Sequence, residues 1–207
     1  MKVVAVSQRV DVHDERGERR DAIDQKLLQF LSASGYIPVP MPNILLLNTT
    51  ESLLEGSTFA SIWIDKIKPQ AFLLSGGNDI ASCNERDATE TCLLDYAAKH
   101  QLPVLGICRG MQMMGIWAGT HLKTVEGHVC TRHMLTGEIT NEVNSFHNQT
   151  LVECPKDFYV LANSSIDGEI EAIRHHNLPW EGWMWHPERE ENFNSYDIRR
   201  IKSLFGD

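Results

Sequence analysis

Several features that define other classes of protein are absent from this chain of 207 residues. No apolar stretch reaches the roughly 20 residues that a membrane-spanning helix needs. The N-terminus runs straight into an expected strand, too soon for a secretion signal. The five cysteines are odd in number, scattered and free of any C-x-x-C pair, which favours a reducing compartment over a disulfide framework. We therefore expect a cytoplasmic protein.

Basic charge is also scarce. The 19 Lys and Arg residues are outnumbered by 28 Asp and Glu residues, giving a net charge of -9. An acidic balance argues against a nucleic-acid or anionic membrane surface as partner. With 42% hydrophobic residues the chain can build a packed core. It contains no repeat, linker or low-complexity segment, so we expect one domain over residues 1–207.

Strands and helices alternate along the first half of the chain. Apolar runs predict strands at residues 3–6, 36–39, 71–74 and 103–107, and helical periodicity marks residues 21–34, 86–100 and 110–118. Residues 43–68 are less regular and predict a loop and a helix around 62–64. The alternation indicates an α/β fold, with an open, mostly parallel sheet and helices on both faces. Shorter strands at 142–143, 159–161, 169–174 and 182–185 and a helix at 194–205 complete the prediction.

The segment Gly106-Ile107-Cys108-Arg109-Gly110 places a cysteine between a strand and a helix. A nucleophile at such a sharp turn is exposed and its backbone is strained. The helix N-terminus that follows favours a thiolate and a developing oxyanion. A free thiol is mostly protonated at neutral pH, so the site must also supply a base. The alternative is a buried structural cysteine.

Residues His186-Pro187-Glu188 provide a candidate base and a carboxylate to orient it. On an extended segment these two side chains would share one face, because side chains alternate with period two. Taken alone, the tripeptide also fits a surface loop. Combined with Cys108, it predicts acyl transfer from a carbonyl substrate.

A second loop, Ser75-Gly76-Gly77-Asn78-Asp79, follows the expected strand at 71–74. Sites in open parallel sheets lie at the carboxyl ends of the strands. If the two strands are neighbours, the backbone N–H of Gly77 can face the thiol. Together with the N–H of Arg109 it would form an oxyanion hole. A plain tight turn is the alternative.

The chain resembles the class I glutamine amidotransferases. The resemblance is carried by residues 106–112, by Val143-Asn144-Ser145-Phe146-His147-Asn148-Gln149 and by Trp185-His186-Pro187-Glu188-Arg189. Within that family the chain is most similar to the γ-glutamyl hydrolase branch (peptidase family C26), which Arg86-Asp87, Glu90 and residues 165–172 also match. The resemblance implies a flavodoxin-like domain in which Cys108, His186 and Glu188 form a catalytic triad.

The same resemblance implies further roles. Gly77 and Arg109 match the oxyanion hole, and the implied substrate contacts are Gly76, Gln112, Asn144, Ser145, Phe146 and His147. Ser145 and His147 would bind the α-amino and α-carboxylate groups of a glutamyl substrate; a polar loop is the alternative. The implied reaction releases glutamate through a γ-glutamyl thioester and needs no cofactor. A homodimer is the working expectation for assembly.

The short segment 78–86 is similar to γ-glutamyl-CDP-amidate hydrolases, which serve phosphoramidate modification of capsule polysaccharide. A diphosphate leaving group would call for positive charge, for which Arg9, Arg86, Arg132 and Arg189 are candidates. Three alternatives stay open: a γ-glutamyl-γ-aminobutyrate hydrolase of polyamine catabolism, a glutaminase subunit that delivers ammonia to a synthetase, and a non-catalytic or redox-sensing protein.

A metal site is not expected. His128, Cys130 and His133 lie within six positions, but three residues do not close a tetrahedral zinc site and the sequence offers no obvious fourth ligand.

Overall fold

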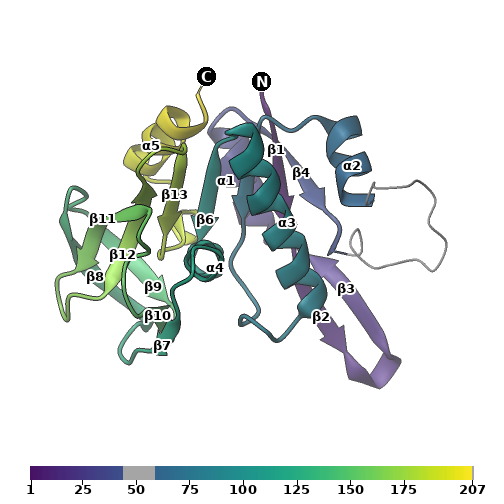
Figure 1. The fold of residues 1–207 in the computed structure, drawn as a ribbon. Helices are drawn as coiled ribbons and strands as arrows, with labels where there is room; N and C mark the ends of the chain where they lie inside the picture. Colours follow the sequence, from purple (N-terminus) through teal and green to yellow (C-terminus); the bar gives the residue numbers. More distant parts are fainter. Residues whose placement is uncertain (44–58, 207) are drawn as a thin grey trace.

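The computed structural model describes residues 1–43 and 59–206. Its centre is a nine-stranded sheet (Figure 1). Five strands of that sheet are parallel and run in the spatial order β4 (Ile37–Met41), β1 (Val3–Ser7), β5 (Ala71–Leu74), β6 (Val104–Ile107) and β13 (Trp180–Trp183). Numbered among themselves, these strands follow the order 2-1-3-4-5 that defines flavodoxin-like sheets. The predicted α/β class is confirmed.

The other four strands extend the sheet in antiparallel fashion. They are β12 (Ile170–His175), β11 (Phe158–Ser164), β8 (Val129–Gly137) and β9 (Glu142–Phe146). Two small sheets lie outside it: β7 (Leu122–Thr124) pairs with β10 (Gln149–Leu151), and β2 (Arg9–His13) pairs with β3 (Glu18–Ala22) around the 3-10 turn η1 (Asp14–Arg16). The sheet is therefore mixed, parallel in its first half and antiparallel in its second.

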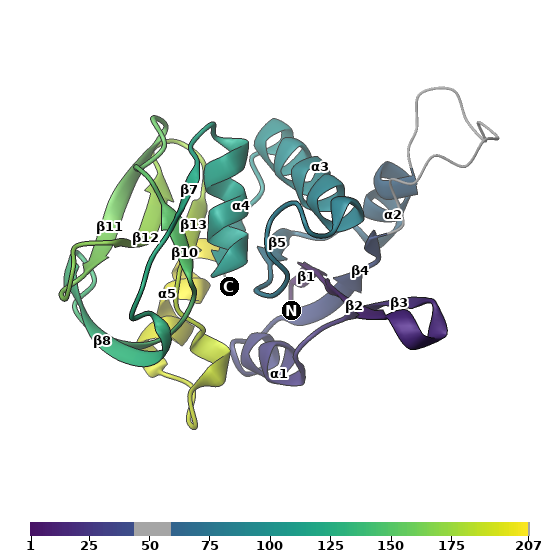
Figure 2. The same cartoon turned by 90° about the horizontal axis from the view of Figure 1, so that it is seen from below.

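Helices cover both faces of the parallel half (Figure 2). Helices α1 (Gln25–Ala33) and α5 (Ser195–Phe205) bury Leu27, Phe30 and Ile201 against one face. Helices α2 (Phe59–Ile67), α3 (Asn84–His100) and α4 (Arg109–Trp117) pack on the other, where Ile64 and Leu93 are buried. Among the described residues, no helix combines the length and the apolar character that crossing a membrane requires.

Local details correct the predicted boundaries. The helix expected from residue 21 begins at Gln25, because β3 occupies residues 18–22 and the Asp24 side chain caps the helix by accepting from the N–H of Lys26. The second strand, expected to end at Val39, continues through Pro40 to Met41. This strand lies at the edge of the sheet, and the N–H of Ile37 donates to the carbonyl of Lys2. The backbone nitrogens of Pro38 and Pro40 point to the open edge, where no N–H is needed. In the span 43–68, helix α2 is confirmed, and residues 44–58 lie outside the described residues.

Candidate active site

Cys108 occupies a sharp turn between β6 and α4. Its backbone has φ 52° and ψ -106°, a combination that is costly for a residue with a side chain, and its N–H donates to the carbonyl of Trp183 at 2.7 Å. Gly106 and Gly110 must be glycines because other backbone atoms pack directly against them. A Cβ on Gly106 would lie 2.6 Å from the carbonyl carbon of Gly110, and one on Gly110 would lie 2.2 Å from the carbonyl oxygen of Leu74. The sequence therefore forces the thiol to the carboxyl end of the sheet.

His186 lies beside Cys108 and is held by Glu188. The Nδ1 atom of His186 is 2.6 Å from Oε1 of Glu188, and both side chains are buried. Burial works against a charged imidazole, but hydrogen bonds to Cys108 and Glu188 outweigh it and raise the pKa of His186 to about 9. The three side chains can therefore pass a proton between sulfur and imidazole while a carboxylate stabilises the imidazolium.

The contact between His186 and Glu188 arises from a different local structure than the sequence predicted. Residues Pro187–Arg189 form the 3-10 turn η3, whereas the sequence argument placed His186 and Glu188 on one face of an extended strand. The proline ring suits the first position of such a turn, since its φ is already helical there. The turn brings the carboxylate back to the imidazole.

Asn144 on β9 fixes the main chain of His186. Its Oδ1 accepts from the His186 N–H at 3.0 Å, and its Nδ2 donates to the His186 carbonyl at 2.8 Å. Nδ2 also donates to Glu190 at 2.7 Å. Asn144 was expected to contact substrate, but in this structure its amide is engaged in positioning the base.

The glycine loop after β5 lies next to the turn that carries Cys108. Strands β5 and β6 are paired in parallel, with Leu74 opposite Gly106. A Cβ on Gly76 would lie 2.6 Å from Cε1 of His186, so the loop backbone and the imidazole are in direct contact. Gly77 has φ 117°, a conformation that favours glycine. The loop is thus held at the carboxyl ends of the strands, in contact with the imidazole.

A buried ion network supports this loop. The guanidinium of Arg86 donates to the carbonyls of Ser75 at 2.6 Å and Gly76 at 3.0 Å, and it pairs with Glu90 at 3.1 Å. Burial would raise the pKa of Glu90, but the charges of Arg86 and Arg109 outweigh burial and lower it. Arg109 also pairs with Asp87. The side chain of Arg109 is therefore engaged away from the thiol.

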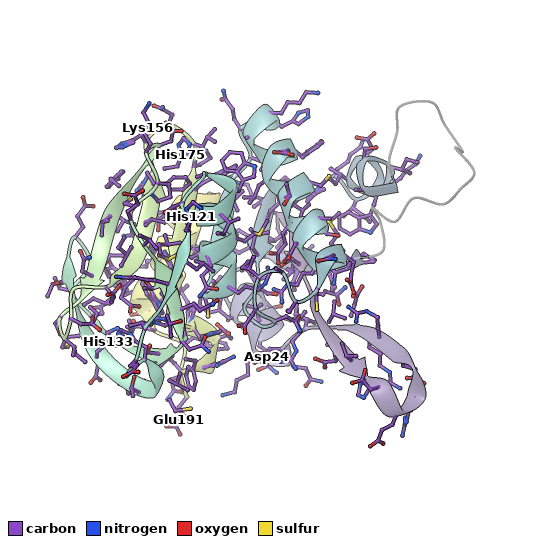
Figure 3. All side chains as sticks on the ribbon, turned by 60° about the horizontal axis from the view of Figure 1, so that its bottom comes forward. Asp24, His121, His133, Lys156, His175 and Glu191 are labelled. Atoms are coloured by element: carbon purple, nitrogen blue, oxygen red, sulfur yellow. The ribbon has the colours of Figure 1, made fainter. Side chains whose placement is uncertain are left out.

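A pocket opens beside the imidazole. His186 and Glu188 form one wall, the glycine loop forms another, and cationic Arg9 and Arg189 complete the lining together with Ala22, Ile23, Asp24, Leu27 and Ser75. The guanidinium of Arg189 lies 4.5 Å from the ring centroid of Phe146, whose ring edge meets His186. Figure 3 labels Asp24 near the middle of the molecule, between the antiparallel extension and the β2–β3 sheet.

Of the four arginines considered for a diphosphate, two reach this pocket. Arg9 and Arg189 line it, with side chains 51% and 36% exposed. Arg86 is fully buried beneath the glycine loop, and Arg132 pairs with Glu142 and Glu190.

The remaining expected substrate contacts make internal hydrogen bonds. Gln112 donates to the carbonyl of Gln149 at 2.9 Å. Ser145 donates to the carbonyl of His128 at 2.8 Å, and His147 lies 3.2 Å from Glu171. Within residues 1–43 and 59–206, none of these polar groups contacts Cys108 or His186. No sequence signal could have revealed the contact of His147 with Glu171, because the two residues lie far apart along the chain.

Residues 47–198 match the model of the family described as glutamine amidotransferase class-I, and the chain belongs to that family. Members of this family are hydrolases acting on C–N bonds. The γ-glutamyl-CDP-amidate hydrolase of Campylobacter jejuni is 32% identical over 135 residues, which cover 62% of this chain and 67% of that protein. A subunit of the glutamine-hydrolysing GMP synthase of Methanothermobacter thermautotrophicus is 32% identical too, over 64% of this chain and 76% of that protein.

Solved structures share the fold. A putative GMP synthase subunit from Thermoplasma acidophilum superimposes with a TM-score of 0.70 and 17% identity, over 100% of this chain and 94% of that one. A glutamine amidotransferase from Thermotoga maritima gives a TM-score of 0.63 at 15% identity, over 99% and 82%. The likeness extends to the antiparallel extension, because both alignments span nearly all of this chain.

Proposed function

We propose that this protein is a cysteine-dependent hydrolase that cleaves a γ-glutamyl C–N bond and releases glutamate. The observation that carries the proposal is the contact chain from Cys108 to His186 to Glu188 at the carboxyl end of β6. The cationic imidazole stabilises a thiolate, which attacks the γ-carbonyl carbon. His186 then gives its proton to the leaving nitrogen, and a γ-glutamyl thioester remains on Cys108. Water attacks the thioester with His186 as base, releasing glutamate and the free thiol.

Backbone groups next to the thiol would stabilise the tetrahedral intermediate. The N–H of Gly77 and the N–H of Arg109 are the proposed donors, and one such donor is typically worth about a hundred- to a thousandfold in rate. Arg86 fixes the carbonyls on the other side of the same loop. With those carbonyls held, the N–H of Gly77 would turn toward the substrate.

Two arginines in the lining of the pocket support a leaving group that carries phosphate. Arg9 and Arg189 are partly exposed and lie beside His186, where the leaving nitrogen would depart. Guanidinium groups suit phosphate oxygens because they can bind two of them at once. The relative from Campylobacter jejuni is named for a γ-glutamyl-CDP-amidate. The proposed substrate is therefore γ-glutamyl-CDP-amidate, cleaved to glutamate and cytidine diphosphoramidate.

A glutaminase subunit is the second candidate. Several relatives are named as subunits of a glutamine-hydrolysing GMP synthase. In that role the same thioester chemistry would act on free glutamine, and the ammonia would go to a partner protein. A γ-glutamyl-γ-aminobutyrate hydrolase differs from the proposed function in its leaving amine, which carries no phosphate.

One panel separates these functions. The isolated protein is assayed for glutamate release from glutamine, γ-glutamyl-γ-aminobutyrate and γ-glutamyl-CDP-amidate. We expect the highest kcat/KM on the CDP-amidate, and Arg9→Ala and Arg189→Ala should lower it on that substrate only. Preference for glutamine that appears only with a synthetase would instead support the glutaminase role.

The nucleophile is tested in the same assay. Cys108→Ala should abolish turnover, and mass spectrometry of quenched wild-type reactions should find a glutamyl adduct on Cys108. Cys154→Ala, at a half-buried cysteine outside the pocket, is the matched control. Full turnover by Cys108→Ala would sink the proposal.

A further inference from the structure

Three buried histidines converge on one carboxylate oxygen in the antiparallel half of the sheet. Oε1 of Glu171, on β12, is 3.3 Å from Nδ1 of His128, 3.3 Å from Nε2 of His133 and 3.2 Å from Nε2 of His147. All four side chains are at most 4% exposed. His133 is labelled in Figure 3, within the antiparallel extension. None of the four residues lines the pocket beside His186.

Hydrogen bonding alone does not account for this cluster. Three ring nitrogens crowd Oε1 of Glu171, while Oε2 of the same carboxylate is buried without a hydrogen-bond partner among the described residues. Both ring nitrogens of His133 are likewise buried without a hydrogen bond there. Buried polar groups normally find partners, because leaving one unpaired costs about 1–3 kcal/mol. In a network held only by hydrogen bonds, we would expect donors on both Oε1 and Oε2 of Glu171.

The ring nitrogens of His147 and His128 that face away from Glu171 also indicate that hydrogen bonds alone do not hold the cluster. Nδ1 of His147 faces the carbonyl of Gln149 at 3.1 Å, and a carbonyl can only accept. Nε2 of His128 is 2.8 Å from a carboxylate oxygen of Asp167, which also accepts when ionised. In the neutral rings, the inner nitrogens therefore carry lone pairs directed at Glu171. Two lone pairs aimed at a carboxylate oxygen repel it unless a proton or a cation lies between them.

The three distances from Oε1 of Glu171 match edges of a tetrahedral metal site. Zinc binds imidazole nitrogen and carboxylate oxygen at about 2.0–2.1 Å, so ligand atoms of a tetrahedral site lie about 3.3–3.4 Å apart. The three separations measured from Glu171 have this length. Metal-bound histidines also donate their second ring N–H to a carbonyl or carboxylate, as His147 and His128 do here. We propose that His128, His133 and Glu171, whose ligand atoms all lie within 4.8 Å of one another, bind a structural Zn²⁺ ion, and that the His147 ring closes the site as fourth ligand when the ion binds.

This proposal replaces the sequence expectation of no metal. That expectation rested on His128, Cys130 and His133, with no fourth ligand in view. Cys130 is exposed and stands outside the cluster. The missing ligands come from His147 and Glu171, which the fold brings in from the segment after β9 and from β12.

A metal ion at this site would cross-link strands of the antiparallel extension that support the candidate active site. It would join β8, β12 and the segment after β9. Strand β9 itself carries Asn144, which holds the main chain of His186. Gln149, which accepts from His147, also accepts from Gln112 on the helix that follows Cys108. The inferred role is positional and thermodynamic, since the ligand atoms are buried and a closed site leaves no position for substrate.

Metal analysis tests the site without reference to activity. The full chain, purified without chelators and dialysed, should hold one zinc ion per chain by elemental mass spectrometry. Chelation should lower the unfolding midpoint, and Zn²⁺ should restore it. Reconstitution with Co²⁺ should give the intense visible absorption of a four-coordinate ion. A wild-type protein that binds neither ion, with a cluster of protonated histidines instead, would overturn the proposal.

Variants locate the ion. His133→Ala and Glu171→Gln should lower zinc affinity by at least about tenfold, as losses of this kind usually do. His121→Ala, at an exposed histidine just before β7, is the control and should keep its zinc. Equal zinc content in all three variants would place any metal elsewhere. If a ligand variant fails to fold, the Co²⁺ spectrum of the wild type decides.

Discussion

Asn144 holds both backbone polar groups of His186, accepting from its N–H at 3.0 Å and donating to its carbonyl at 2.8 Å. The two residues belong to different halves of the sheet, so this contact ties the antiparallel extension to the imidazole. Removing it should leave the base present but misplaced.

Asn144→Ala should lower kcat about tenfold or more and change KM little, because a displaced imidazole slows proton transfer without weakening substrate binding. Steady-state kinetics on the preferred γ-glutamyl compound measures both constants. Asn163→Ala, which also removes a side-chain hydrogen bond to a carbonyl, is the matched control. A raised KM with unchanged kcat would instead favour the direct substrate contact that the family resemblance implies.

Gly76→Ala should disable the site through a single methyl group. The new Cβ would come within 2.6 Å of Cε1 of His186, so the ring or the loop must move. A displacement of about 1 Å can cost roughly a hundredfold in rate, and we expect a fall in kcat of that order. Gly17→Ala provides the comparison, because Gly17 has a positive φ and no atom within 4 Å of the added Cβ. Unchanged kcat in Gly76→Ala would show that the imidazole does not occupy this position during turnover.

Glu188→Gln should change the pH dependence of turnover. Hydrogen bonds to Cys108 and Glu188 keep the pKa of His186 at about 9 despite burial, so the imidazole stays charged up to that pH. If the reaction starts from the charged imidazole, kcat/KM declines as pH rises through about 9. Loss of the carboxylate lowers the pKa of His186, so the decline should move to lower pH and turnover should fall about a hundredfold.

The control for this shift is Glu142→Gln, at an exposed carboxylate that pairs with Arg132. Its pH profile should overlay that of the wild type. Glu188→Gln should also be less damaging than Cys108→Ala, since the carboxylate orients the base and does not react. Coincident pH profiles for wild type and Glu188→Gln would argue against the charged imidazole as the starting state.

Cys108 lies in a backbone conformation that glycine adopts more readily than alanine, with φ 52° and ψ -106°. Cys108→Gly should therefore be more stable than Cys108→Ala by about 1 kcal/mol, although both lack the thiol. Chemical denaturation gives the two free energies of unfolding. At Cys154, whose φ is not positive, the order should reverse. The same order at both positions would contradict strain at the turn.

Asp197 should make stability fall with rising pH. Burial and the charge of Glu190 raise the pKa of Asp197 from 3.8 to about 7, against the opposing effects of Trp185 and Arg200. Between those values the folded chain binds a proton that the unfolded chain has lost, so the free energy of unfolding decreases as pH rises, and the penalty is complete above about 7.

Asp197→Asn removes that penalty, and the variant should be more stable than the wild type at pH 8 by up to about 4 kcal/mol. Denaturation curves at several pH values measure the slope, which should flatten between pH 4 and pH 7. Asp14→Asn, at an exposed carboxylate in η1, should keep the wild-type slope. A wild-type stability that does not fall across this range would refute the assignment.

The parallel half of the fold was predicted well from sequence because its signals are local. Strand β5 was predicted with its observed bounds, and the strand and helix flanking Cys108 within one residue. Strands β2, β3, β8, β7 and β10 were missed. The first two form an exposed hairpin with Arg19 and Arg20 in place of an apolar face, and β8 carries a bulge that breaks its alternation. These segments form strands because of the strands they pair with, and their own residues carry little strand signal.

Motifs predicted that Cys108 and His186 act together, and they also drew attention to Arg86 and Glu90. They did not reveal what each polar group contacts. Asn144 and Ser145 lie in a recognisable segment, yet their partners His186 and His128 are set by the register of β9 with β8 and by the turn after β13. Contacts between residues this far apart in the chain require the folded structure.

Trp183 and Trp185 stack with their rings 6° from parallel and their centroids 5.2 Å apart, both buried in the core. Two indoles so arranged couple their electronic transitions, which gives the protein an intrinsic circular dichroism signal in addition to that of its backbone. Because Trp185 directly precedes His186, the contribution of this pair depends on the main chain that carries the base, and it adds to that of the tilted pair Trp117 and Trp180. A change in this contribution on the substitution Trp183→Phe would identify the part of the spectrum that follows the imidazole of unlabelled protein.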